Sequence, residues 1–125
     1  MNTEPRNINE EIYSKLNTIL YFQKDIDTLE SIYKSIPFDI DDLIEINEIH
    51  LLNMFSRYKD NQVDLKIIER WANLIEMTDG YYFANDSVSN VIHDLANLSI
   101  VSENNKIEFV ESLIKNYLEY QVFLD

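Results

Sequence analysis

One amphipathic segment, from Asp64 to Met77, constrains the fold of this chain most strongly. Its apolar residues recur at the spacing of a helix with about 3.6 residues per turn, and they include the only Trp, Trp71. Asp64 is a typical N-cap, because its carboxylate can accept the free N–H groups of the first turn. The only Gly, Gly80, can adopt the left-handed conformation that often ends a helix. We therefore predict the inner helix of a bundle here.

Similar periodicity predicts further helices on both sides of this segment. The region from 7 to 35 fits either one long kinked helix or two separate helices, and Pro37 ends it. The short polar turn at 59–62 predicts that the helix before it lies antiparallel to the 64–77 helix. No pattern indicates a strand pair, so we predict an all-α fold, with residues 1–125 forming a single compact bundle of five to six helices. The other predicted helices span 39–58, 86–97 and 106–121.

Composition supports a packed protein and excludes several classes of chemistry. Hydrophobic residues make up 46% of the chain, which has one Gly and two Pro, unlike a disordered chain. The absence of Cys excludes disulfides, thiol redox chemistry and thiolate metal sites. The N-terminal residues lack a secretory pattern, and no run of 18 apolar residues occurs. We therefore expect a soluble, cytoplasmic protein.

The charge balance is strongly acidic. Ten Lys and Arg against 23 Asp and Glu give a formal net charge of -13 at pH 7. Such a field repels nucleic acids and anionic membranes, which proteins bind through clustered basic residues, and it attracts basic partners by long-range steering. The simpler alternative is that the acidity only keeps the protein soluble.

Ten acidic residues lie in two stretches, 35–56 and 71–105, that contain no Lys or Arg. They cannot be helix-stabilising ion pairs, which need opposite charges three or four residues apart, so they favour a binding surface. For Asp39, Asp41 and Asp42 an alternative is that they occupy the first turn of a helix, where carboxylates are favoured by the helix dipole.

In the second stretch, Asp79 and Asp86 flank three adjacent aromatic residues, Tyr81 to Phe83, in a predicted loop. Exposed rings beside charges are typical of binding hot spots, although one or two of these rings are expected to fold back over the core. The predicted partner-binding residues are Asp79, Tyr81, Tyr82 and Asp86, followed by Asp39, Asp42, Glu45 and Glu48.

The patterns that indicate catalysis or metal binding are incomplete. His93-Asp94 matches the central dipeptide of HD-type phosphohydrolases, but His50 is the only other His. The 39–42 acidic run lacks the spacing and central Gly of a calcium-binding EF-hand loop, and neither His follows the Glu-x-x-His spacing of di-iron bundles. We therefore predict no enzyme activity, no catalytic residue, no cofactor and no metal.

Two short motifs resemble a known group of proteins. The segment from Glu69 to Glu76 (ERWANLIE), followed by Asp79 and later by Leu95-Ala96-Asn97, resembles small acidic all-α bacterial immunity proteins of the contact-dependent growth inhibition and polymorphic toxin systems. The resemblance covers about residues 62–97. It implies a protein that binds and neutralises a cognate toxin, often a nuclease with a basic phosphate-binding face.

Two functions therefore remain open from the sequence. The first is an immunity protein that binds a basic toxin and has no nucleic acid or membrane partner. The acidic and aromatic residues named above are its predicted binding residues. The second is a regulatory or scaffolding helical module that self-associates or binds a partner helix through Tyr117, Tyr120 and Phe123. We expect a monomer in the first case and a homodimer in the second.

Overall fold

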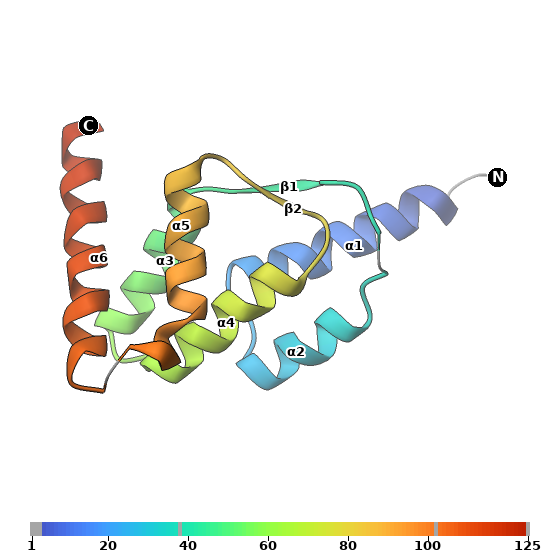
Figure 1. The fold of residues 1–125 in the computed structure, drawn as a ribbon. Coiled ribbons are helices and arrows are strands. Elements are labelled where there is room, and N and C mark those ends of the chain that lie inside the picture. Colours follow the sequence, from blue (N-terminus) through green and yellow to red (C-terminus); the bar gives the residue numbers. More distant parts are fainter. Residues whose placement is uncertain (1–3, 38, 102, 125) are drawn as a thin grey trace.

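The computed structural model describes residues 4–37, 39–101 and 103–124, with side chains for 10–37, 39–101 and 105–116 (Figure 1). The described chain is predominantly helical, which confirms the predicted all-α class. The prediction that no strand pair exists is wrong, because two three-residue strands form a small sheet. The elements are α1 (Glu4–Leu20), α2 (Ile26–Lys34), β1 (Ile44–Ile46), α3 (Glu48–Lys59), α4 (Leu65–Met77), β2 (Tyr81–Phe83), α5 (Asp86–Ala96), the short 3₁₀ helix η1 (Leu98–Ile100) and α6 (Glu103–Leu124).

Helix α4 lies at the centre of the fold, as its sequence pattern predicts. Asp64 is its N-cap and accepts the backbone N–H of Ile67 at 2.9 Å. The apolar face packs mainly on α5 and also contacts α1 and α2 (Figure 1). Trp71 is fully buried, and its indole Nε1–H donates to the carbonyl of Ile19 at 3.0 Å. The same carbonyl also accepts the backbone N–H of Phe22 at 3.1 Å, so the indole is a second donor to it at the end of α1.

The region from 7 to 35 forms two helices rather than one kinked helix. Helix α1 ends where Phe22 adopts a left-handed backbone (φ 51°), and the N–H of Gln23 then bonds the carbonyl of Thr18 at 3.0 Å. This is the pattern of a Schellman motif, with Phe22 in the place that Gly usually takes. Asp25 begins α2 by accepting the N–H of Thr28 at 2.8 Å. The break therefore comes from local capping at both helix ends.

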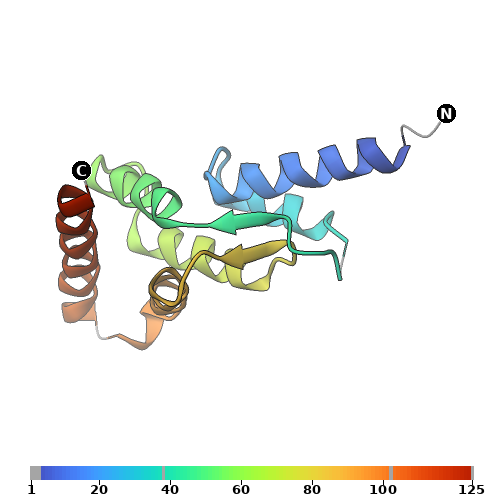
Figure 2. The same cartoon turned by 90° about the horizontal axis from the view of Figure 1, so that it is seen from above.

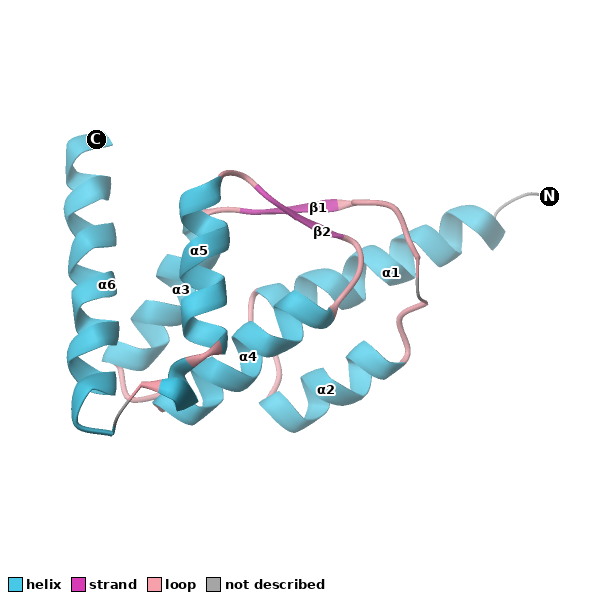
Figure 3. Ribbon diagram, in the orientation of Figure 1, coloured by secondary structure: helices cyan, strands magenta, loops and turns pink. Residues whose placement is uncertain are grey.

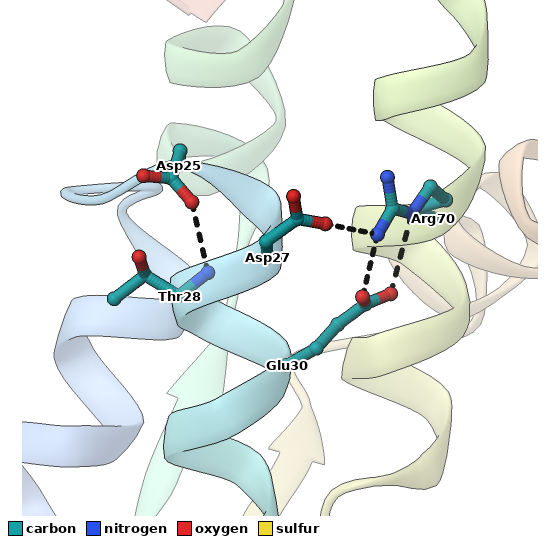
Figure 4. Close-up of polar contacts among 5 residues, drawn as sticks. All are labelled: Asp25, Asp27, Thr28, Glu30 and Arg70. Atoms are coloured by element: carbon teal, nitrogen blue, oxygen red, sulfur yellow. Dashed lines mark hydrogen bonds and ion pairs between the residues drawn. The ribbon is translucent and has the colours of Figure 1, made fainter.

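Helices α2 and α4 are also joined by a surface cluster of charges (Figure 4). The Arg70 guanidinium on α4 bonds the carboxylates of Asp27, at 2.7 Å, and Glu30 on α2. These two bonds raise the pKa of Arg70 above its ordinary value. Arg70 thus offsets one of the two negative charges that Asp27 and Glu30 carry.

The structure corrects the helix predicted at 39–58. Its first part is extended and contains β1, and α3 begins only at Glu48. Asn47 is the N-cap of α3: its side chain accepts the N–H of Ile49 at 3.0 Å, while its own N–H donates to Nδ1 of His50 at 3.1 Å. Asp39, Asp41 and Asp42 therefore do not occupy a first helical turn, and the alternative that they serve the helix dipole is wrong.

Helix α3 packs on α6 rather than against α4, where the short turn predicted that it would lie. Asn61 closes α3 in a left-handed conformation (φ 61°), and the N–H of Gln62 bonds the carbonyl of Arg57 at 2.8 Å. The chain therefore leaves the end of α3 in a new direction before α4 begins (Figure 1). On α6, Val110 and Ile114 are buried.

The sheet joins two segments that are far apart in the sequence. Strands β1 and β2 run parallel, with Ile44 beside Tyr81, Glu45 beside Tyr82 and Ile46 beside Phe83 (Figures 2 and 3). Because side chains alternate along a strand, Glu45 and Tyr82 share the solvent face, and the other pairs face the helices. We call this pair of strands, with the residues that flank it, the ribbon.

Gly80 connects α4 to the ribbon. Helix α4 ends at Thr78, whose hydroxyl and N–H both donate to the carbonyl of Leu74, so Gly80 does not itself end the helix. Its backbone is left-handed (φ 102°), and its carbonyl accepts the N–H groups of Leu43 at 2.8 Å and Ile44 at 3.0 Å. The only glycine of the chain therefore lies where the two ribbon segments first meet.

We expect Gly80→Ala to lower the free energy of unfolding by about 1–3 kcal/mol. A Cβ at this position would strain the left-handed backbone and would lie 2.9 Å from the terminal methyl groups of Ile40 and Leu16. Urea unfolding followed by circular dichroism measures the change. The control, Ala84→Ser, alters an exposed residue after β2 and should change stability by less than about 0.5 kcal/mol. Equal stabilities of the two variants would contradict this role of Gly80.

Candidate partner-binding surface

The ribbon brings together the two acidic stretches that the sequence singled out. At one end, the backbone N–H of Asp39 donates to Oδ2 of Asp79 at 2.8 Å. At the other end, Nδ2 of Asn85 donates to Oε1 of Glu48 at 3.0 Å. Between these contacts, Glu45 pairs with Tyr82. These contacts join the segments 39–48 and 79–86. We define the acidic ribbon surface as the acidic residues of these two segments together with Tyr82: Asp39, Asp41, Asp42, Glu45, Glu48, Asp79, Asp86 and Tyr82.

Most carboxylates of this surface face solvent, and none of them belongs to a described ion pair. Six of them are exposed, and Glu48 is half-buried. Among the described side chains, the ion pairs lie elsewhere: Lys15 with Glu11, Arg70 with Asp27 and Glu30, and His93 with Glu76. The surface therefore carries negative charge that no described ion pair neutralises, which is the condition for attracting a cationic partner.

Backbone geometry fixes the end of this surface at Asp39. Asp39 has a left-handed backbone (φ 58°), a conformation that costs a residue other than glycine about 1 kcal/mol or more. Aspartate tolerates it better than most residues, and here the N–H is held by the Asp79 carboxylate. Further along, the backbone N–H groups of Leu43 and Ile44 donate to the carbonyl of Gly80 and hold the two segments together. The two acidic segments are thus joined by several directional bonds.

The three adjacent aromatic residues divide between surface and core. Tyr82 points outward and is 43% exposed. Tyr81 points inward: its hydroxyl donates to the carbonyl of Leu16, and burial raises its pKa. Phe83 is partly buried against the core. The expectation that one or two rings fold back is confirmed. The placing of Tyr81 on the binding surface is wrong, because strand alternation turns its side chain toward α1.

His50 anchors the ribbon to α3 and was not identified from the sequence as a structural residue. It is buried, its Nδ1 accepts the N–H of Asn47, and its ring meets the Tyr21 ring edge-on at 4.8 Å. Burial lowers its pKa, and the nearby charge of Glu45 opposes this shift in part. Because Nδ1 acts as an acceptor, the imidazole is neutral and carries its hydrogen on Nε2.

We expect His50 to make stability depend on pH. With a native pKa below the ordinary value of 6.5, the unfolded state binds the proton more readily. The contribution of His50 is therefore complete above pH 6.5 and is lost as the pH falls toward the lowered pKa. The stability difference between wild type and His50→Gln should shrink on acidification from pH 7 to 5, by up to about 1.4 kcal/mol per pH unit.

Urea titrations at several pH values measure this difference. Acidification also affects the many carboxylates, but wild type and His50→Gln share them. Subtracting the two free energies of unfolding at each pH therefore removes that effect. His93→Gln is the matched control, since His93 is exposed on α5 and contacts Glu76 at 3.2 Å. The same pH dependence in both variants would contradict the assignment to His50.

The described residues also bear on chemistry and on the alternative surface. Within that part of the chain, no group of three or more His, Asp or Glu side chains could hold a metal ion. No described helix has the length and apolarity needed to cross a bilayer. The side chains of Tyr117, Tyr120 and Phe123, proposed for helix-mediated association, lie outside the described side chains.

Two residues that cap the helices after β1 and β2 could have been recognised in the sequence. Asn47 follows Ile44–Ile46, and Asn85 comes two residues after Tyr81–Phe83, so each short β-rich run precedes an Asn that begins a helix. Comparison with protein families, curated proteins and solved structures finds no match.

Proposed function

We propose that this protein is a cytoplasmic immunity protein, without enzyme activity, that binds and neutralises a cationic protein toxin. The toxin proposed is a nuclease domain with a basic phosphate-binding face. One observation carries the proposal: the β1–β2 pairing joins two acidic segments without Lys or Arg into one exposed surface beside Tyr82. The resemblance of residues 62–97 to immunity proteins points in the same direction.

The physical basis is complementary charge with an aromatic anchor. Clustered carboxylates attract a basic partner over about a Debye length and raise the association rate. Carboxylates can also occupy the positions where a nuclease binds phosphate oxygens, because both groups accept hydrogen bonds from Arg and Lys. Tyr82 adds a ring with a polar end, which is typical of residues that dominate binding energy.

Affinity capture and reconstitution test the proposal. The protein is used to capture partners from the cells that produce it, in parallel with the ribbon variant Asp41→Asn/Asp42→Asn/Glu45→Gln. The control variant Asp60→Asn/Asp94→Asn/Glu108→Gln removes the same charge from exposed residues outside the surface.

We expect wild type and control to retain a basic protein that the ribbon variant loses. When purified, that protein should degrade nucleic acid or stop growth, and one equivalent of the wild type should block it. Capture of the same proteins by all three forms, or of a partner whose activity is unaffected, would contradict the proposal.

We expect Tyr82→Ala to weaken binding of this partner by about 2 kcal/mol, chiefly through faster dissociation. The ring is exposed on the ribbon and makes no described side-chain hydrogen bond, so folding should be little affected. Surface plasmon resonance separates the two rate constants. Tyr13→Ala, which removes an equally exposed ring from α1, should leave both unchanged. Equal dissociation rates for the two variants would contradict the anchor role of Tyr82.

A further inference from the structure

The ribbon leaves backbone hydrogen-bonding groups unused. Its ladder is set by the bonds from the N–H of Ile44 to the carbonyl of Gly80 and from the N–H of Ala84 to the carbonyl of Ile46. In a parallel pair with this register, the backbone groups that bond between the strands belong to Ile44 and Ile46 on β1 and to Tyr82 on β2. The alternate residues turn their N–H and C=O groups to the outer edges of the sheet. Within the described chain, these groups of Glu45, Tyr81 and Phe83 have no hydrogen-bond partner.

The two edges differ in their surroundings. Helix α1 contacts β1 and runs along the β1 side of the ribbon, whereas Figure 2 shows no other helix or strand beside the outer edge of β2 until α5 begins. Asp79 precedes this edge, and Asp86 follows it. Native proteins usually cover, charge or shorten an exposed strand edge, because it can pair with another chain. Here the edge is short and flanked by acid, so it disfavours a second copy of this acidic chain.

We propose that the β2 edge takes an extended, Lys- or Arg-rich segment of the partner protein as an added strand. This inference rests on the proposed function and specifies how the partner binds. Tyr81 and Phe83 would supply the main-chain hydrogen bonds. Alternate basic side chains of the added strand would lie on the same face as Glu45 and Tyr82, within reach of the ribbon carboxylates. Backbone pairing gives affinity, and charge selects the partner.

A short peptide tests this mode directly. The probe is a capped peptide of alternating Lys and Val, about eight residues long, which matches the period of a strand. The matched control has the same sequence and charge, but the backbone nitrogens of its two central residues are methylated. Neither edge of this peptide can then donate a backbone hydrogen bond at its centre. Binding and amide hydrogen exchange are followed by NMR on the full chain at low salt.

We expect the first peptide to slow exchange of the Tyr81 and Phe83 amides about tenfold or more at saturation, with that of Glu45 unchanged. The N-methylated peptide should bind about tenfold more weakly. Unchanged exchange at Tyr81 and Phe83, or equal affinity of the two peptides, would overturn the added-strand mode.

These outcomes are separate from the test of function. If the peptides bind equally but the ribbon variant still loses its toxin, the added strand is wrong and the inhibitor function stands. If the first peptide protects Tyr81 and Phe83 but no toxin is neutralised, the edge site stands and the inhibitor function is wrong.

Discussion

We expect Trp71→Ala to lower the free energy of unfolding by about 3–5 kcal/mol, the largest loss for any single substitution proposed. Trp71 is fully buried on the central helix, so its removal leaves a cavity between α4 and its neighbours. It also leaves the carbonyl of Ile19 without the indole N–H that lies 3.0 Å away. Chemical denaturation with a two-state analysis measures the change.

Two further variants separate packing from the hydrogen bond. Trp71→Phe keeps most of the ring volume but lacks the N–H, so it should cost less than the Ala variant. Met77→Ala changes a residue of the same helix that is 56% exposed, and it should alter stability by less than about 1 kcal/mol. Similar losses for Trp71→Ala and Met77→Ala would show that α4 is not the inner helix of the protein.

The second large effect is expected in the kinetics of partner binding. The ribbon variant, which removes three of the negative charges, should associate with the cationic partner about ten- to a hundredfold more slowly at low salt. Dissociation should become faster by a smaller factor, because the same carboxylates also accept hydrogen bonds from Arg and Lys of the bound partner. Stopped-flow measurements over a series of salt concentrations give the association rate and its salt dependence.

The control variant separates the effect of where the charges lie from the effect of the total charge on the association rate. It carries the same net charge as the ribbon variant, but its substitutions lie at Asp60, Asp94 and Glu108. Its association rate should stay within about threefold of the wild type, because screening limits the influence of distant charges. If both variants slow association equally, overall acidity and not the ribbon attracts the partner.

The helical part of this fold could be predicted from the sequence because its signals are local. The 64–77 segment combines a helical stripe of apolar residues with an N-cap, and the structure places α4 within a residue of those bounds. The segment at 86–97 is equally periodic and forms α5. The 39–58 region has apolar residues that fit either period, and pairing with β2 selects the extended form for its first part.

The ribbon could not be predicted because its information is non-local. Each strand has only three residues, and their pairing depends on the Gly80 turn and on the capping of α3 by Asn47. For the same reason, the sequence identified the acidic residues of both stretches but not their adjacency. It also did not separate Tyr82 from Tyr81, since that requires knowing that the segment is a strand with one side buried.

The most direct test of the central claim is hydrogen–deuterium exchange of the complex with the captured basic partner. The proposal predicts that exchange slows in both segments of the ribbon, 39–48 and 79–86, when the partner binds, and that the two regions respond together. Protection confined to α6, or to only one of the two segments, would contradict a single docking surface formed by β1 and β2.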